Sequence, residues 1–203
     1  MPHPGWPASA ASGPVAIRPL RRRDASVWRE VRLANQQWLL PWEPSSALSW
    51  PERHTRSAYL SMLRVLQRQA RAGQTFPFAI TYEGQLAGQL TIGNIVRGSF
   101  QSGYAGYWVD GRLAGRGIVP TALALAVDHS LGPAGLHRVE VNIRPENTAS
   151  RRVVDKLGFR EEGLHRRLLF IDGAWRDHIS YALTAEDLPR GLLARWLSVR
   201  HTG

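Results

Sequence analysis

The segment from Tyr104 to Leu131 constrains the fold of this chain more than any other. It begins with a strand-like stretch, Tyr104–Asp110 (YAGYWVD), and continues through the glycine-rich sequence GRLAGRG at 111–117. An apolar helix is then expected over Ile118–Leu131, where Gly132-Pro133 ends it. A strand, a tight loop and a buried helix in this order predict a domain that mixes a sheet with helices.

The loop in this segment has the properties of a phosphate-binding turn. Gly115 and Gly117 let the backbone turn tightly and approach a ligand. The helix that follows presents unpaired N–H groups and the positive end of its dipole. Arg112 and Arg116 add positive charge. Together these features suit a pyrophosphate, and a plain strand-to-helix turn is the alternative.

Two other nucleotide-binding motifs are excluded at this position. A P-loop requires a lysine followed by serine or threonine, and the loop contains no lysine. A Rossmann fingerprint requires a third glycine three residues after the second, and residue 120 is proline.

The rest of the chain alternates between strand-like and helix-like patterns. Strands are expected at 15–20, 76–82, 85–96, 137–143, about 159–170 and 174–183, and helices after Asp24 (which can cap the first), at 52–72, at 147–157 and from near Thr184 through Trp196. The stretch Trp38–Pro44 (WLLPWEP) contains two prolines and is expected to be an aromatic loop. This order predicts a central, largely antiparallel sheet with helices on its faces.

Length and composition indicate one globular domain. The chain has 203 residues, of which 43% are hydrophobic. Residues 1–14 (MPHPGWPASAASGP) are expected to form a flexible tail and residues 15–203 the domain. No apolar run approaches the ~18 residues of a membrane span, and no secretory signal is apparent, so we expect a cytoplasmic protein. The absence of cysteine excludes disulfides, thiolate metal ligands and a cysteine nucleophile.

The charge balance favours polyanionic partners. The formal net charge is +10, and Lys156 is the one lysine among the basic residues. Arginine suits bidentate contacts with phosphate, although a bias in genomic base composition explains its abundance equally well. Coenzyme A (CoA), RNA and an acidic protein segment are all compatible with such a surface.

Several motifs in the expected order resemble one known superfamily. The sequence R-x-x-G-x-G after a strand ending in WVD resembles the acyl-CoA motif of the GCN5-related N-acetyltransferases (GNAT). The pieces N-x-x-S, K-L-G-F-x-x-E-G and G-x-x-x-D-H-x-x-Y, within 142–181, are similar to the Rim-type ribosomal-protein N-terminal acetyltransferases, and WLLPWEP resembles their RimJ branch, which acts on ribosomal-protein alanine. The resemblance covers roughly residues 15–185. It implies a single α/β (α+β) GNAT domain whose mostly antiparallel mixed sheet splays apart between two parallel strands, with helices on both faces.

The resemblance also implies a binding site for acetyl-CoA at that splay, between Tyr104–Asp110 and His137–Ile143. Main-chain groups on the first strand, the N–H groups of the glycine loop and polar residues on the next helix would hold the cofactor. The residues concerned are Trp108, Val109, Asp110, Arg112, Gly115, Arg116, Gly117, Ile118, Asn147 and Ser150. From the residues alone, Asn147 can simply cap its helix, Ser150 can be solvated and Trp108 can belong to the core.

The catalytic residues implied by the resemblance are Ser150, Glu140 and Asn142. Ser150 matches a hydroxyl that can hydrogen-bond the leaving thiolate. Asn142 stands where some relatives carry a glutamate base, and Glu140, two residues earlier on the same strand face, can act through a water. His165, Asp177 and Glu43 are further candidates for the base, since an ammonium must lose a proton before it attacks a thioester. No metal is expected to take part.

The acceptor is expected to be an N-terminal α-amine, and a ribosomal protein is the expected partner. An α-amine has a pKa of about 7.7–8.0 and a lysine amine about 10.4, so an enzyme without an obvious base deprotonates the former more easily. Trp38, Trp42 and Glu43 in the aromatic loop are candidates for the acceptor site. The alternatives are a small-amine acceptor, another acyl donor such as succinyl-CoA, and a non-catalytic module that binds RNA or associates with the ribosome.

Overall fold

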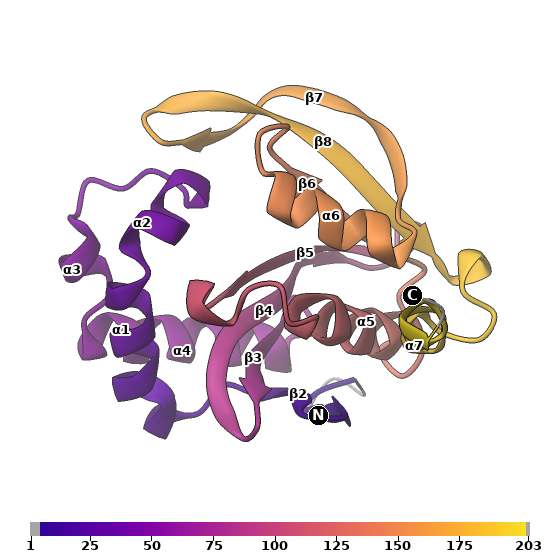
Figure 1. The fold of residues 1–203 in the computed structure, drawn as a ribbon, viewed down its shortest axis with the longest axis horizontal. Helices are drawn as coiled ribbons and strands as arrows, with labels where there is room; N and C mark the ends of the chain where they lie inside the picture. The colour runs from indigo at the N-terminus through magenta and orange to yellow at the C-terminus, as the bar shows by residue number, and fades with distance from the viewer. Residues whose placement is uncertain (1–4, 202–203) are drawn as a thin grey trace.

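The protein is organised around one eight-stranded sheet. The computed structural model describes residues 5–201 (Figure 1). In the sheet the strands follow the order β1-β2-β3-β4-β5-β6-β8-β7. Their bounds are Ala10–Ser12 (β1), Val15–Pro19 (β2), Phe76–Tyr82 (β3), Gln85–Val96 (β4), Ser102–Val109 (β5), Arg138–Ile143 (β6), Arg160–Ile171 (β7) and Ala174–Thr184 (β8). Neighbouring strands are antiparallel except β5 and β6, which are parallel.

Helices cover both faces of this sheet (Figure 1). The α-helices are Ala25–Ala34 (α1), Gln36–Leu39 (α2), Trp50–Arg53 (α3), Arg56–Arg71 (α4), Ile118–Leu131 (α5), Thr148–Leu157 (α6) and Leu192–His201 (α7). Helix α5 packs across β2, β4, β5 and β6, with α6 and α7 beside it. Helices α1 and α4 pack against β4 and β3 on the opposite face.

Because side chains alternate between the two faces of each strand, the core is divided into one cluster on each face of the sheet. Phe76, Phe78 and Ile80 of β3 belong to the larger cluster under α5, whereas Ala79 belongs to the smaller cluster under α1 and α4. Helix α5 itself is buried almost all round, which explains why its sequence is apolar without a polar face.

The register of β5 is the feature that shapes the functional site. Strand β5 pairs with β4 along its whole length, as far as Val109 opposite Gly88. Its parallel pairing with β6 covers only Ser102, Gly103 and Tyr104, opposite 138–140. Residues 105–109 of β5 and 141–143 of β6 are therefore not paired with each other, and we call the region between them the splay.

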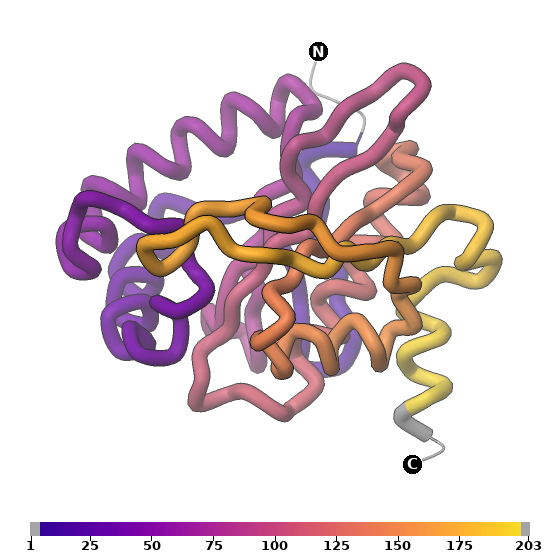
Figure 2. The backbone as a smooth tube through the Cα atoms, turned by 90° about the horizontal axis from the view of Figure 1, so that it is seen from above, coloured from indigo at the N-terminus to yellow at the C-terminus, as the bar shows by residue number. Residues whose placement is uncertain are grey.

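The β7–β8 hairpin extends beyond the sheet and meets the segment that follows α2. Figure 2 shows the hairpin reaching the indigo-to-purple part of the chain that contains α2 and α3. There Pro44 forms a bridge with Ile171, and the Ser45 N–H donates to the Phe170 carbonyl at 3.0 Å. The Gly173 N–H donates to the Ser45 hydroxyl at 2.8 Å. These contacts attach the turn of the hairpin to residues 44 and 45, at the end of the aromatic segment 38–44.

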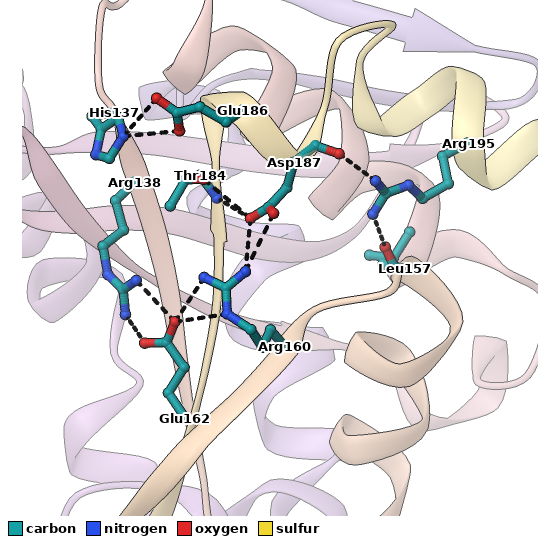
Figure 3. A network of polar contacts seen from close by, with 9 residues as sticks. All are labelled: His137, Arg138, Leu157, Arg160, Glu162, Thr184, Glu186, Asp187 and Arg195. Carbon is teal, nitrogen blue, oxygen red and sulfur yellow. Dashed lines mark hydrogen bonds and ion pairs between the residues drawn. The ribbon is translucent and has the colours of Figure 1, made fainter.

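An ion-pair network joins the far ends of β6, β7 and β8 to the last helix (Figure 3). Arg138 bonds Glu162, which also accepts from Arg160 at 2.9 Å. Arg160 reaches Asp187, whose main-chain carbonyl accepts from Arg195 on α7. The network holds the paired end of β6 in place, away from the splay.

Most expected elements are confirmed, and the mixed, mostly antiparallel sheet with a splay between two parallel strands is as the resemblance implies. Helix α5 has the expected bounds and Asn147 caps α6. The expected helix over 52–72 is divided into α3 and α4, because Thr55 starts a new helix by accepting from the Ala58 N–H. Asp24 does not cap α1: its carboxylate instead binds Arg18 and the Arg21 N–H.

Two expectations about the chain ends are wrong. The last helix begins at Leu192 rather than near Thr184, because Pro189 and Gly191 separate it from a short 3-10 turn and Asp128 caps its first N–H groups. Within the expected tail, residues 10–12 form β1. Trp6 stacks on Phe76 there, and its buried apolar surface explains why this part is ordered. Residues 1–4 of that tail lie outside the described residues.

Among the helices of residues 5–201, none combines the length and apolar character needed to cross a membrane.

Gly88 allows β4 to approach the last residues of β5, which border the splay. A Cβ at this position would lie 2.2 Å from the Trp108 carbonyl oxygen and 3.0 Å from the Val109 Cα. Because both obstacles are backbone, we expect Gly88→Ala to lower the free energy of unfolding by about 2 kcal/mol or more. Urea denaturation measures this.

Gly106 provides the control, since a Cβ there has nothing within 4 Å. Gly106→Ala should change the free energy of unfolding by less than about 0.5 kcal/mol. Equal effects at the two glycines would contradict the tight β4–β5 contact.

Candidate active site

The splay leaves main-chain groups of β5 without a strand partner. The Asp110 N–H donates to the Ala87 carbonyl at 2.8 Å, which makes this a hydrogen-bonded position of the β4–β5 ladder. Such positions alternate along an antiparallel pair, so the main chain of Trp108 also faces β4 while that of Tyr107 and Val109 faces the splay. Of the three residues expected to offer main-chain contacts, only Val109 has main-chain groups that face the splay, and Tyr107 is an addition that the sequence did not suggest.

A cavity of about 530 Å³ opens on the α5 and α6 side of the splay. We call it the loop cavity. Its lining comes from the aromatic segment, the end of β5, the glycine loop with the start of α5, and one face of α6. The residues are Trp38, Leu39, Trp42, Glu43, Tyr107, Trp108, Val109, Leu113, Ala114, Gly115, Gly117–Pro120, Glu146–Ser150, Arg152, Val153 and Lys156.

A second cavity of about 370 Å³, the sheet cavity, lies on the other side of the splay. Side chains of β4, β5, β6 and β8 form its floor. The lining residues are Trp42, Glu43, Pro44, Gln89, Thr91, Ala105–Trp108, Val141–Arg144, Asn147, Ser150, Ile171 and His178. The two cavities share residues from β5, α6 and the aromatic segment, so they meet at the splay: Trp42, Glu43, Tyr107, Trp108, Asn147 and Ser150.

Asn35 anchors the start of the glycine loop. Its side-chain oxygen accepts from the Gly111 N–H at 2.8 Å, and its amide donates to the Asp110 carboxylate at 3.1 Å. Burial raises the pKa of Asp110, but hydrogen bonds from Arg112 and Asn35 outweigh it and hold the pKa below its usual value. Asp110 is thus an ionised residue that anchors the loop, and nothing in its sequence context pointed to Asn35.

The glycine loop makes a tight turn at two glycines. Gly115 has φ of 81° and Gly117 has φ of 76°, a region that favours glycine. Gly117 is the N-cap of α5, so the first N–H groups of that helix border the loop cavity. The expected arginines contribute less: Arg112 is 68% exposed and paired with Asp110, and neither Arg112 nor Arg116 is among the described lining residues.

Positive charge reaches the loop cavity from α6 instead. Arg152 and Lys156, the one lysine of the chain, lie four residues apart on the helix face that lines the cavity. The same face presents Ser150 and Val153. Sequence reasoning missed both cations, although their four-residue spacing in the helix expected after Asn147 places them on one helix face.

A buried arginine holds the aromatic segment. Arg32 is 3% exposed, and its guanidinium carbon lies 4.8 Å from the Trp50 ring centroid and 5.0 Å from that of Trp108. It forms an ion pair with Glu43 at 2.8 Å. Burial lowers the pKa of Arg32 and Glu43 counteracts this. Glu43 lines both cavities, and its carboxylate is already engaged by Arg32.

His54 completes this cluster in its neutral form. The His54 Nδ1 donates to the Trp50 carbonyl at 2.7 Å, and Nε2 accepts from the Arg32 Nε at 3.0 Å. Burial, followed by the charge of Arg32, lowers the pKa of His54 to about 4.

The expected acceptor residues Trp38 and Trp42 lie at the splay rather than in the core. Trp38 is 43% exposed and lines the loop cavity. Trp42 borders both cavities, and the Arg144 guanidinium lies 5.3 Å from its ring centroid. Arg144 also donates to the Pro41 carbonyl at 2.8 Å, which ties the aromatic segment to the end of β6.

Asn147 and Ser150 stand at the junction of the cavities. The Asn147 side chain caps α6 by accepting from the Ser150 N–H at 3.0 Å, so the capping interpretation is confirmed. The Ser150 carbonyl is 3.5 Å from the hydroxyl of Tyr107, whose pKa is raised by burial. Tyr107 is therefore a neutral donor directed at the first turn of α6.

The residues expected as candidates for the base lie in different parts of the structure. Asn142 lines the sheet cavity, and its Oδ1 is buried without a hydrogen-bond partner among the described residues. Glu140 accepts from Arg138 at 2.7 Å and is not among the described lining residues of either cavity. Asp177 accepts from the Arg167 N–H, and His165 is exposed on the hairpin. The structure does not bring these last three to the splay.

The sheet cavity is also lined by a histidine that sequence reasoning missed. His178 is 2% exposed and lines the cavity next to Asn142. His178 is the histidine of the D-H-x-x-Y motif. Because side chains alternate along a strand, His178 and Asp177 point to opposite faces of β8, and of the two only His178 lines the cavity. Within residues 5–201, no group of three or more His, Asp or Glu side chains gathers closely enough to hold a metal ion.

Comparison with known proteins agrees with this geometry. Residues 15–160 match the model of the acetyltransferase (GNAT) domain family. The chain is 32% identical to the [ribosomal protein uS5]-alanine N-acetyltransferase of Escherichia coli over 87% of this chain and 91% of that protein.

Two solved structures extend the comparison. A structure of Mycobacterium smegmatis RimJ in complex with CoA-disulfide is 45% identical, with a TM-score of 0.95, and the match covers 98% of this chain and 97% of that one. The ribosomal-protein-S5-alanine acetyltransferase of Vibrio fischeri is 27% identical, with a TM-score of 0.81, over 89% of this chain and 98% of that one.

The buried His54 makes stability depend on pH. Its pKa is about 4 when folded and near 6.5 when unfolded, so between these values the unfolded chain binds a proton that the folded chain does not. The free energy of unfolding should therefore fall as the pH is lowered through this range. His54→Gln keeps an acceptor for Arg32 and should lose less stability between about pH 7.5 and about pH 5.

Urea denaturation of both proteins at both pH values measures how much unfolding free energy each loses. The contributions of all other titrating groups cancel when the two losses are compared. An identical loss in the variant would show that His54 is not buried as a neutral residue.

Proposed function

Because the chain belongs to the GNAT acetyltransferase family and is an N-acetyltransferase, we propose that it transfers an acetyl group from acetyl-CoA to the N-terminal α-amine of a ribosomal protein. The observation that carries the proposal is the splay, where two cavities on opposite sides of the sheet meet at Ser150 and Trp42. Direct transfer between two substrates needs this arrangement, since each approaches the reacting carbon from its own side.

The loop cavity fits acetyl-CoA. The main chains of Tyr107 and Val109 offer unpaired groups that the two amides of a pantetheine arm can satisfy. The N–H groups from Gly115 to Ile118 suit a pyrophosphate, and Arg152 and Lys156 supply charge for phosphate groups. The volume of about 530 Å³ lies within the ordinary range for small-molecule sites.

The groups around the thioester have assigned roles in this proposal. The Val109 N–H faces the splay and stabilises the negative charge that develops on the carbonyl oxygen during attack. The Ser150 hydroxyl hydrogen-bonds the departing sulfur, while the Asn147 cap holds the first turn of α6 in position. Acetyl-CoA, when bound, supplies an activated thioester.

The acceptor enters through the sheet cavity. Trp42, fixed by Arg144, and Trp38 form an apolar wall on which a peptide can pack. Glu43 already pairs with Arg32 at 2.8 Å and Arg53 at 3.8 Å, so we assign it to orienting this wall rather than to binding the ammonium directly.

An open groove supports a polypeptide acceptor over a small amine. It has a volume of about 550 Å³ and lies between residues 44–50 and the β7–β8 turn, where it shares Glu43 and Pro44 with the sheet cavity. A small amine would not use this continuation, whereas the residues after an N-terminal amine would. The similarity to enzymes named for ribosomal-protein alanine supports the same choice and makes an N-terminal alanine the first to test.

The experiment offers the purified protein acetyl-CoA and a peptide that begins with alanine and contains an internal lysine. We expect release of free thiol, and mass spectrometry should place the acetyl group on the α-amine. The matched control is the same peptide with a formylated N-terminus, which should release no thiol above background. Acetylation of the lysine instead, or turnover with polyamines but not with peptides, would contradict the proposal.

A further inference from the structure

The acceptor side of the splay presents a buried oxygen without a partner. Asn142 lies opposite Ser180 in the β6–β8 ladder, so both side chains are on the sheet face that forms the floor of the sheet cavity. The Asn142 Oδ1 has no hydrogen-bond partner within the described part of the chain. A buried polar atom without a partner is costly, and because Asn142 lines the sheet cavity, its side chain is suited to a ligand that donates a hydrogen bond.

His178 lies on the same face, two residues before Ser180 on β8, and borders the same cavity. Its Nδ1 is 3.0 Å from the Arg176 carbonyl, which can only accept. Nδ1 therefore carries the hydrogen in the neutral ring, and Nε2 is left with a free lone pair. The imidazole is thus held in the tautomer that a proton acceptor requires.

The charges around His178 favour this neutral form. Burial lowers its pKa, and Arg144 at the end of β6 lowers it further. The Arg176 carbonyl, Asp177 on β8 and Glu146 before α6 act in the opposite direction without restoring the ordinary value. His178 is accordingly unprotonated at neutral pH.

The other titratable groups considered for this step are paired with other residues or lie outside the lining of the sheet cavity. Glu140 is bound by Arg138, and Glu43 is paired with Arg32. Asp177 accepts from a main-chain N–H on β7. His165 is exposed, directly opposite His178 on β7, and is not among the described lining residues of the sheet cavity.

We propose that Asn142 and His178 form the site that receives the acceptor amine, with Asn142 Oδ1 accepting a hydrogen bond from its nitrogen and His178 Nε2 taking its proton. This inference rests on the proposed acetyl transfer to an α-amine. It makes His178 a catalytic residue and Asn142 a binding residue of the same reaction.

The proton and bond balance of the step is complete. The α-ammonium gives one proton to His178 Nε2, and the resulting amine attacks the thioester carbon. The C–N bond forms while the C–S bond breaks, and the second proton leaves the nitrogen for the departing sulfur, which ends as the free thiol. His178 then releases its proton to water.

This arrangement also selects the acceptor. An α-ammonium has a pKa of about 7.7–8.0, within reach of a neutral imidazole. A lysine ammonium, at about 10.4, would transfer its proton to the same base several hundredfold less favourably, roughly tenfold for each pKa unit.

The test compares His178→Ala with the unchanged protein in acetylation of an alanine-initiated peptide. We expect kcat to fall about a hundredfold or more, the usual contribution of a general base. Free imidazole should restore part of the lost rate in proportion to its concentration, because it can enter the space that the side chain vacates. The rise of kcat with pH should move from below about 6.5 in the unchanged protein toward the pKa of the peptide amine in the variant.

Three controls make the result specific. His165→Ala removes the opposing histidine and should leave kcat and its pH dependence unchanged. Calorimetric titration of CoA should give the same Kd for His178→Ala, His178→Gln and the unchanged protein, which shows that the donor side is folded. Asn142→Leu should raise KM for the peptide about tenfold, the cost of about one hydrogen bond, without altering the Kd for CoA.

The outcomes separate this inference from the proposed function. If the unchanged protein acetylates no peptide, the proposed function fails first. If it does so and both His178 variants retain kcat within about threefold, or lose it without rescue by imidazole and without a change in the pH profile, His178 is not the base.

Discussion

The early end of the β5–β6 ladder is the constraint on which the rest of the site depends. A parallel pair normally continues until one strand ends, and here β5 runs five residues past its last partner on β6, Tyr104 opposite Glu140. The pairing of β5 with β4 continues to Val109, so β5 keeps its strand conformation past the end of its pairing with β6. Its outer edge therefore presents main-chain groups in fixed positions, a preorganised surface that a flexible loop would not provide.

The walls of the splay are held by two sets of polar contacts. Asn35 fixes Gly111 and so sets the start of the glycine loop. From the same end of α1, Arg32 lies among three tryptophan rings and pairs with Glu43, while Arg144 holds Pro41 and Trp42. Both sets come from polar residues that are buried or half-buried, so the position of the aromatic segment depends on satisfied polar contacts rather than on apolar packing alone.

The elements could be predicted from sequence wherever local chemistry determines them. The bounds of α5 follow from an apolar run between Gly117 and Gly132, and the hairpin turns follow from Glu83-Gly84 and Asp172-Gly173. The start of α7 was mistaken because an amphipathic pattern does not reveal that Pro189 and Gly191 interrupt it. The order of residues 5–14 was missed because it depends on Trp6 reaching β3, a contact far away in sequence.

The site was only partly predictable for the same reason. Motif resemblance identified the glycine loop, Asn147, Ser150 and Asn142, which the structure brings to the two cavities. It could not show that the Trp108 and Asp110 main chains face β4, since that follows from the register of a long-range ladder. Arg32 and His178 look like ordinary polar residues in the sequence, and their burial arises from segments that meet only in the folded chain.

Residue-resolved amide hydrogen exchange by NMR, with and without acetyl-CoA, tests the central claim most directly. The N–H groups of Trp108 and Asp110 are directed at β4 and should exchange slowly in both states. Those of Tyr107 and Val109 face the splay and should exchange faster in the free protein and become protected when acetyl-CoA binds. Protection of Tyr107 and Val109 without ligand, or no change on binding, would mean that the splay is not where the acetyl donor lies.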